Sequence, residues 1–202
     1  MVVPAVAAGG HPPYEASIER LDRAAREEMT GVSWHRGCPV RLRELRVLHI
    51  TIWGFDREAH RGQLIVRRRW AEDLTHVFRR IYRAKFAIRR MRPVDRYDAD
   101  DRRSMRADNT SAFNCRFVAG TTRWSQHAYG RAIDLNPVEN PYVAGDHVSP
   151  RAGRPFADRS RHRRGMVHRG DVVWRAFHRI GWGWGGLWSG AKDYQHFSAT
   201  GT

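Results

Sequence analysis

Two short segments of the sequence carry side chains whose types and spacing suit metal chemistry. In the first segment His127 precedes Asp134, and Gly130 stands between them. Glycine tolerates the left-handed backbone of a tight turn, so the chain can fold back and bring the imidazole beside the carboxylate. Together these side chains would supply one nitrogen and one oxygen ligand, a donor set that zinc accepts.

The second segment, residues 192–198, contains Asp193 and His196. A catalytic zinc ion usually takes three protein ligands and keeps its fourth position for water, so His196 is the candidate third ligand. Asp193 is then the candidate base that takes a proton from water. Residues three apart in a flat strand face opposite sides, and Asp193 must therefore lie on a turn that enters the strand of His196.

The residues that carry a family resemblance are Ser125, His127, Gly130, Ala132, Asp134, Asp193 and His196. Their types, order and spacing resemble the zinc peptidases of the VanY-type D-alanyl-D-alanine carboxypeptidase family. That family also includes D,D-dipeptidases and L-alanyl-D-glutamate endopeptidases. The resemblance is firm over residues 110–200 and weaker over residues 45–92, and residues 1–30 lie outside it.

The resemblance implies one zinc ion per chain, held by His127, Asp134 and His196. It implies Asp193 as the catalytic base, and it makes Ser125 a candidate for substrate binding. The family also carries an arginine that binds substrate or stabilises the developing oxyanion. Arg116 is the nearest match, although it follows Phe-Asn-Cys here and the family places it in a Tyr-Arg-Ser context.

The substrate that the resemblance implies is a peptide bond in a peptidoglycan stem peptide, hydrolysed by a zinc-activated water. Carboxypeptidase and dipeptidase members usually carry glutamate at the base position, whereas endopeptidase members often carry aspartate. Asp193 therefore favours an internal bond, and the carboxypeptidase alternative stays open. Such a substrate implies an extracellular or cell-envelope location. The alternative function is a catalytically silent zinc-containing module that binds cell-wall peptides.

The elements that must position these residues are mixed strands and helices. Residue types and apolar spacing predict helices over residues 17–29, 70–90 and 171–180, strands over residues 46–53, 62–66, 112–118, 132–136 and 195–198, and a loop over residues 93–111. The absence of a βαβ rhythm favours the α+β class. The resemblance adds a small central antiparallel sheet flanked by helices, with the zinc site on the sheet, as in folds of the DD-peptidase and Hedgehog type.

A length of 202 residues suits one domain. We expect residues 1–30 to form an N-terminal segment with a short helix, and residues 31–202 to form a single zinc peptidase domain. No apolar run reaches the roughly 20 residues of a transmembrane helix. Residues 1–10 lack the charged start and apolar stretch of a complete secretory signal, although residues 5–8 resemble its small-residue end.

The chain is strongly basic, with 36 lysines and arginines against 21 acidic residues and a formal charge of +15. This balance attracts polyanions such as nucleic acid or anionic polymers of the cell envelope. The arginines are spread over the whole length, so a solvated basic surface is the other interpretation. A nucleic-acid-binding function would leave the metal motif unexplained, and we expect no specific nucleic-acid partner.

The cysteines and a tryptophan-rich stretch each leave two interpretations open. Cys38 and Cys115 either form one long-range disulfide, which would imply an oxidising compartment, or remain as two buried thiols. Trp182, Trp184 and Trp188 either form a wall for ligand binding or fill the core around glycines.

Overall fold

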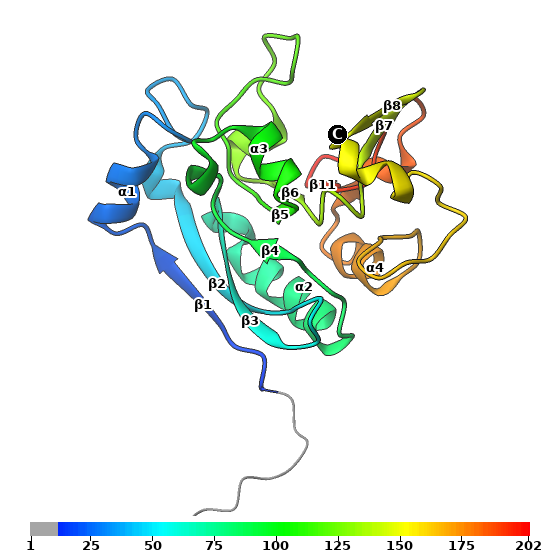
Figure 1. Cartoon of the computed structure of the whole chain (residues 1–202). Coiled ribbons are helices and arrows are strands. Elements are labelled where there is room, and N and C mark those ends of the chain that lie inside the picture. Colours follow the sequence, from blue (N-terminus) through cyan, green and yellow to red (C-terminus); the bar gives the residue numbers. More distant parts are fainter. Residues whose placement is uncertain (1–11) are drawn as a thin grey trace, which may run out of the picture.

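The structure is a computed structural model that describes residues 12–202 and combines short helices with small sheets, as the predicted α+β class requires (Figure 1). The α-helices are α1 (Arg23–Met29), α2 (Ala71–Arg83), α3 (Asp101–Arg106) and α4 (Val172–His178). The strands are β1 (Ala16–Arg20), β2 (Leu45–Trp53), β3 (Ala59–Arg67), β4 (Arg90–Met91), β5 (Asn109–Thr110), β6 (Ala132–Asp134), β7 (Tyr142–Ala144), β8 (His147–Ser149), β9 (Gly183–Trp184), β10 (Lys192–Asp193) and β11 (His196–Ser198). The 3-10 helices are η1 (Leu42–Glu44), η2 (Arg68–Trp70), η3 (Val94–Tyr97), η4 (Gln126–Tyr129), η5 (Arg151–Phe156) and η6 (Gly185–Leu187).

The largest sheet is antiparallel and has the strand order β1-β2-β3. Its β2–β3 hairpin confirms the two strands that β-branched and aromatic residues predict, and α2 lies along one face of it (Figure 1). Phe78 of α2 meets Phe177 of α4 edge to face, with ring centroids 6.3 Å apart. The hairpin, α2 and α4 thereby share one hydrophobic core.

The predicted helix over residues 17–29 is wrong in its first part. Ala16–Arg20 forms β1, which pairs along β2, and α1 begins only at Arg23. Asp22 sets this boundary because its side chain accepts a hydrogen bond from the backbone N–H of Ala25, as an N-cap does. The residues before the cap satisfy their backbone at the sheet edge, and Ile18 stays 39% exposed.

A second hydrophobic cluster joins α1 to the other side of the hairpin. It contains Leu21, Met29, Leu45 and Phe113. A disulfide links Cys38 to Cys115 at its rim, with the Cα atoms 5.9 Å apart. The bond closes a sequence separation of 77 residues, so it ties the segment after α1 to the segment that leads into η4.

Three further expectations for secondary structure need correction. Residues 112–118 form no regular strand, because successive backbone N–H groups bond to different segments: Phe113 to Ile65 and Cys115 to Ser33. The expected loop over residues 93–111 contains η3 and α3, short polar helices without an apolar stripe. The helix expected to reach residue 90 ends at Arg83.

Two expectations concern membrane passage and export. Within residues 12–202 no helix is long and apolar enough to cross a bilayer. Residues 5–8, which resemble the end of a signal, lie outside the described residues.

Candidate metal centre

A small antiparallel sheet with the order β6-β11-β9 brings Asp134 and His196 together. In its register Asp134 lies directly opposite His196, and Ile133 lies opposite Phe197. Because side chains alternate along a strand, Ile133 and Phe197 enter the hydrophobic core while the polar pair faces the other way. The spacing within each motif thus gives one buried apolar face and one face with metal-binding chemistry.

His127 reaches the same place from η4. Ser125 caps this turn: its hydroxyl oxygen accepts a hydrogen bond from the backbone N–H of His127, 3.3 Å away. Gly130 ends the turn with a φ of 62°, in the left-handed region. The turn that the glycine predicts is therefore present, and it brings His127 beside Asp134.

The three side chains converge on one point. Nε2 of His127 lies 3.2 Å from Oδ2 of Asp134, and Nδ1 of His196 lies 3.0 Å from Oδ1 of Asp134. The two ring nitrogens are 3.3 Å apart. One potential ligand atom from each residue lies within 4.8 Å of the others, and all three residues are buried.

Hydrogen bonding determines which nitrogen His127 offers. Its Nδ1 contacts the carbonyl oxygen of Ala112, and a carbonyl can only accept, so Nδ1 carries the proton. A histidine that ligates a metal must be neutral, and in that state the Nε2 of His127 would carry the lone pair and face Asp134 and His196. A metal-ligating histidine typically donates its other N–H to such a backbone carbonyl, which fixes the ring.

Electrostatics couple Asp134 to the two histidines. Burial disfavours its charged form, but the charges and hydrogen bonds of His127 and His196 hold the pKa of Asp134 well below its ordinary value. Burial likewise opposes protonation of His196, whereas its hydrogen bond to Asp134 raises the His196 pKa. The carboxylate therefore remains ionised inside the protein and available as an oxygen ligand.

Asp193 lies at the edge of this group, at the end of β10 and opposite Tyr142 of β7. The expected position of Asp193 on a turn is therefore wrong: it stands on β10, a strand separate from that of His196, and the turn follows it at residues 194–195. Because the two residues lie on different strands, they need not face opposite sides as they would in one flat strand. Gly185 makes the placement possible, since a side chain there would bring its Cβ to 2.5 Å from the Asp193 carbonyl oxygen. The glycine-rich stretch therefore serves close packing behind Asp193.

Asp193 is half-buried, and its Oδ1 atom is buried without a hydrogen-bond partner within residues 12–202. Burial raises the pKa of Asp193 to about 6, and the negative charge of Asp134 adds to this shift. A carboxyl group with a spare oxygen and a pKa close to neutrality suits proton transfer.

These residues line a cavity of about 590 Å3, and Arg116 and Ser125 line it too. The Arg116 guanidinium forms an ion pair with Asp101 of α3, 2.9 Å long, while its Nε is buried and lacks a partner in the described chain. The sequence gives no signal for Asp101, because the polar segment around it has no recognisable spacing. All predicted site residues of the motifs therefore meet in one cavity.

The three tryptophans of the glycine-rich stretch do not share one role. Trp182 and Trp184 are buried in the core, so they fill space. Trp188 lines the cavity, and its ring centroid lies 5.6 Å from that of His196. Tyr142 and His147 of the β7–β8 hairpin also line the cavity. The sequence offers no signal for these two, since the hairpin reaches the site only through the pairing of β10 with β7.

Two other groups of potential ligands occur in the described residues. His35 lies beside Cys38 and Cys115, but the disulfide removes both thiolates as ligands. Asp56, Glu58 and His60 form an exposed group on the β2–β3 hairpin. The buried group of His127, Asp134 and His196 is the one surrounded by a cavity with further reactive side chains.

The comparison with protein families concerns the part of the chain that carries this geometry. Residues 119–199 match the family model described as D-alanyl-D-alanine carboxypeptidase. The resemblance predicted from the sequence is thereby confirmed for this part of the chain, and the match supports a hydrolytic peptidase with peptidoglycan-related substrates. No curated protein and no solved structure matches the chain.

Proposed function

We propose that this protein is a zinc-dependent metallopeptidase that hydrolyses a peptide bond in peptidoglycan stem peptides. The single observation that carries the proposal is the buried convergence of His127, Asp134 and His196 within 4.8 Å of one another. It lies inside the residues that match the carboxypeptidase family. We further propose that the β6-β11-β9 sheet corresponds to the zinc-bearing sheet of the DD-peptidase type of fold.

The donor set fits zinc. Two imidazole nitrogens and one carboxylate oxygen are ligands that zinc binds in catalytic sites, and the backbone contact of His127 leaves its Nε2 free to coordinate. A bound zinc ion would supply a Lewis acid that polarises the scissile carbonyl and lowers the pKa of water to about 7.

Asp193 is proposed as the catalytic base. Asp193 lines the same cavity as the three candidate ligands, and its Oδ1 has no hydrogen-bond partner among the described residues, so it can take a proton from the attacking water. The same carboxylic acid can then give that proton to the leaving nitrogen, so that the peptide bond breaks to release a neutral amine instead of an amide anion.

Arg116 and Ser125 are proposed to bind the substrate. The Arg116 side chain is 31% exposed and lines the cavity, so its guanidinium can pair with a substrate carboxylate or with the developing oxyanion. Its ion pair with Asp101 holds the guanidinium in place before substrate arrives. Ser125 already caps the turn of His127, and its hydroxyl proton remains available to a substrate carbonyl.

The remaining expectations extend this proposal. We take residues 31–202 as the catalytic domain, with β1 and α1 as an N-terminal segment that packs on it. The proposed substrate places the enzyme outside the cytoplasm, where a disulfide such as Cys38–Cys115 persists. The proposed partners are the stem peptide and anionic envelope polymers, without a specific nucleic acid.

Mass spectrometry of defined muropeptides incubated with the purified protein tests the function. We expect cleavage that stops when a zinc chelator is added and resumes when zinc is restored. Loss of terminal D-alanine would make the enzyme a carboxypeptidase, whereas a cut between L-alanine and D-glutamate would make it an endopeptidase and account for Asp193. Binding without cleavage by the zinc-loaded protein would contradict the proposal and favour a cell-wall-binding module.

A further inference from the structure

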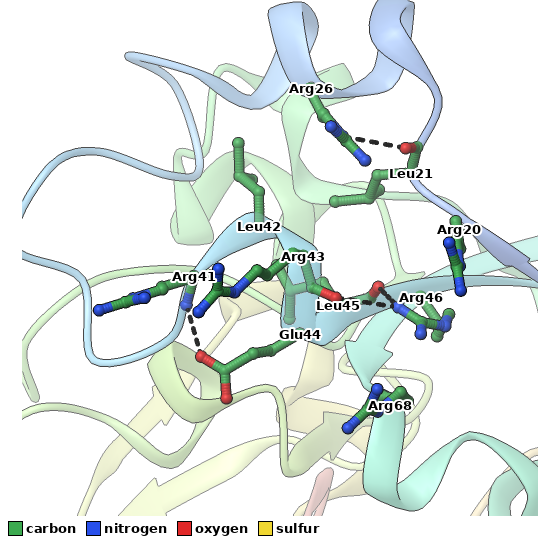
Figure 2. Close-up of a pocket in the computed structure, with 10 residues that line it drawn as sticks. All are labelled: Arg20, Leu21, Arg26, Arg41, Leu42, Arg43, Glu44, Leu45, Arg46 and Arg68. Atoms are coloured by element: carbon green, nitrogen blue, oxygen red, sulfur yellow. Dashed lines mark hydrogen bonds between the residues drawn. The ribbon is translucent and has the colours of Figure 1, made fainter.

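A second cavity, of about 550 Å3, lies on a part of the molecule that the proposed chemistry does not use (Figure 2). Six arginines line it, and we call it the arginine cavity: Arg20, Arg26, Arg41, Arg43, Arg46 and Arg68. They come from the end of β1, from α1, from η1 and its flanks, and from the start of η2. The arginine cavity shares no lining residue with the cavity of about 590 Å3 that His127, Asp134 and His196 line, which we call the metal cavity.

Backbone carbonyls hold two of these guanidinium groups in place. The Nη1 atom of Arg46 donates to the carbonyl oxygens of Arg43 and Leu45, at 3.1 and 2.7 Å. The Nε atom of Arg26 donates to the carbonyl oxygen of Leu21 at 3.0 Å. Figure 2 shows these bonds and the other arginines around the same hollow. Each oriented guanidinium keeps further N–H groups for a ligand, since arginine has five.

The positive charge of the cavity is not compensated. Across residues 12–202 none of the six arginines forms an ion pair with a carboxylate. The one carboxylate in the lining, Glu44, is taken up by the backbone N–H of Arg41 and by Arg67, which lies outside the lining. Burial together with the charges of Arg68 and Arg20 lowers the pKa of Arg46. An anion in this hollow would relieve the repulsion among the guanidinium groups.

The lining also indicates which kind of anion fits. It contains only arginines, leucines and Glu44, so it has no aromatic face on which a nucleobase could stack. Guanidinium groups match phosphate oxygens through paired N–H donors. The arginines come from separate segments around one hollow of about 550 Å3, an arrangement that suits successive phosphates of a single flexible chain.

We propose that the arginine cavity binds the phosphate groups of a phosphodiester polymer attached to the cell wall. This inference rests on the proposed function, because a stem-peptide hydrolase works beside such polymers. Since the two cavities are separate, the polymer can stay bound while a stem peptide occupies the metal cavity. The site would retain the enzyme on its insoluble substrate between cuts.

The test uses the full chain and isolated cell walls that carry a phosphodiester polymer, with and without hydrofluoric acid treatment, which cleaves phosphodiesters. The variant is Arg43→Gln with Arg68→Gln, and the matched control is Arg80→Gln with Arg83→Gln, which removes the same charge from exposed positions of α2. We expect the Arg43/Arg68 variant to bind untreated walls about tenfold more weakly, and the control pair to bind like the wild type. Neither pair should bind treated walls differently from the wild type.

Soluble muropeptide cleavage is measured in parallel, because it separates this inference from the proposed function. Unchanged cleavage with weaker wall binding supports the arginine cavity, whatever the bond cleaved. Equal loss of wall binding in both double variants would overturn the inference, since only net charge would then matter. Cavity-dependent binding to a DNA duplex or to phosphatidylglycerol vesicles, without cavity-dependent binding to walls, would overturn it in favour of those ligands.

Discussion

The metal cavity and the arginine cavity differ in how far their charged side chains are buried and in the signs of those charges. In the metal cavity the charged groups are buried, and His127, Asp134 and His196 are only 3%, 4% and 6% exposed. The Asp134 carboxylate therefore lies against both imidazoles, because an unpaired buried charge is costly. Five of the six arginines of the other cavity are exposed and Arg46 is intermediate, so water screens charges of one sign. The difference teaches that burial favours groups of opposite charge, as the proposed cation site needs, whereas exposure permits charges of one sign, as in the proposed anion site.

Removing a histidine of the metal cavity should have the largest effect. We expect His127→Ala or His196→Ala to lose bound zinc and to reduce stem-peptide cleavage by about 10^4-fold or more, because each removes one of the three proposed ligands. Elemental analysis and muropeptide assays measure both properties. His76→Ala, at an exposed position of α2, is the control. Binding to cell walls should not change, and a variant that keeps zinc and turnover would disprove the ligand assignment.

Neutralising Asp193 should separate metal binding from turnover. Asp193→Asn keeps the size of the side chain and removes the proton acceptor, so cleavage should fall by about 10^2- to 10^3-fold while zinc content stays at that of the wild type. Asp146→Asn makes the same chemical change in the exposed turn between β7 and β8 and should leave cleavage intact. An active Asp193→Asn protein would remove Asp193 from the mechanism.

Gly130 ends the turn that carries His127 of the metal cavity, and it also packs against Leu45, which lines the arginine cavity. Its carbonyl oxygen accepts the N–H of Arg67, and a Cβ on Gly130 would stand 2.7 Å from that nitrogen and 3.2 Å from Leu45. We expect Gly130→Ala to lower the free energy of unfolding by about 2–4 kcal/mol, from left-handed backbone strain and the clash together.

The matched control is Gly145→Ala, where φ is 56° but nothing lies within 4 Å of the added Cβ. Urea unfolding measures the free energy of unfolding of both variants, and the difference between their values is the energetic cost of the clash at Gly130. Equal destabilisation of the two proteins would mean that the backbone relaxes around Gly130, and that the two cavities are less tightly joined than the contacts indicate.

Ionic strength should affect wall binding more than peptide cleavage, and this is the smallest of the expected effects. Raising ionic strength from about 0.15 to 0.5 M should weaken wall binding roughly tenfold, if about two phosphates are contacted. Cleavage of soluble, uncharged model peptides should change less than about twofold, because buried charges are poorly screened. Cosedimentation and peptide assays measure these responses. Wall binding that ignores salt would contradict an electrostatic origin.

Much of the fold and of the candidate site follows from local sequence. The β2–β3 hairpin follows from β-branched and aromatic residue types, and α2 and α4 follow from apolar periodicity, both of which depend only on neighbouring residues. Gly130 sets the turn after His127, and the alternation around Asp134 separates its core face from its site face. Asp193 and His196 could be named from their motif, although their placement on separate strands could not.

Other features depend on contacts between distant segments, and only the tertiary structure decides them. The Ala16–Arg20 segment forms a strand because an edge of β2 is available, although its own spacing favours a helix. The pairing of Arg116 with Asp101 and the presence of Trp188 beside His196 likewise need the folded chain.

The arginine cavity shows the same division between sequence and tertiary structure. A composition with 36 basic residues determines that the surface is positive, and the motifs determine which side chains can do metal chemistry. Composition has no direction in space, so it cannot gather arginines from β1, α1, η1 and η2 into one hollow. Long-range packing gathers them, because it decides which backbone carbonyls accept hydrogen bonds from each guanidinium and which carboxylates lie too far away to form ion pairs.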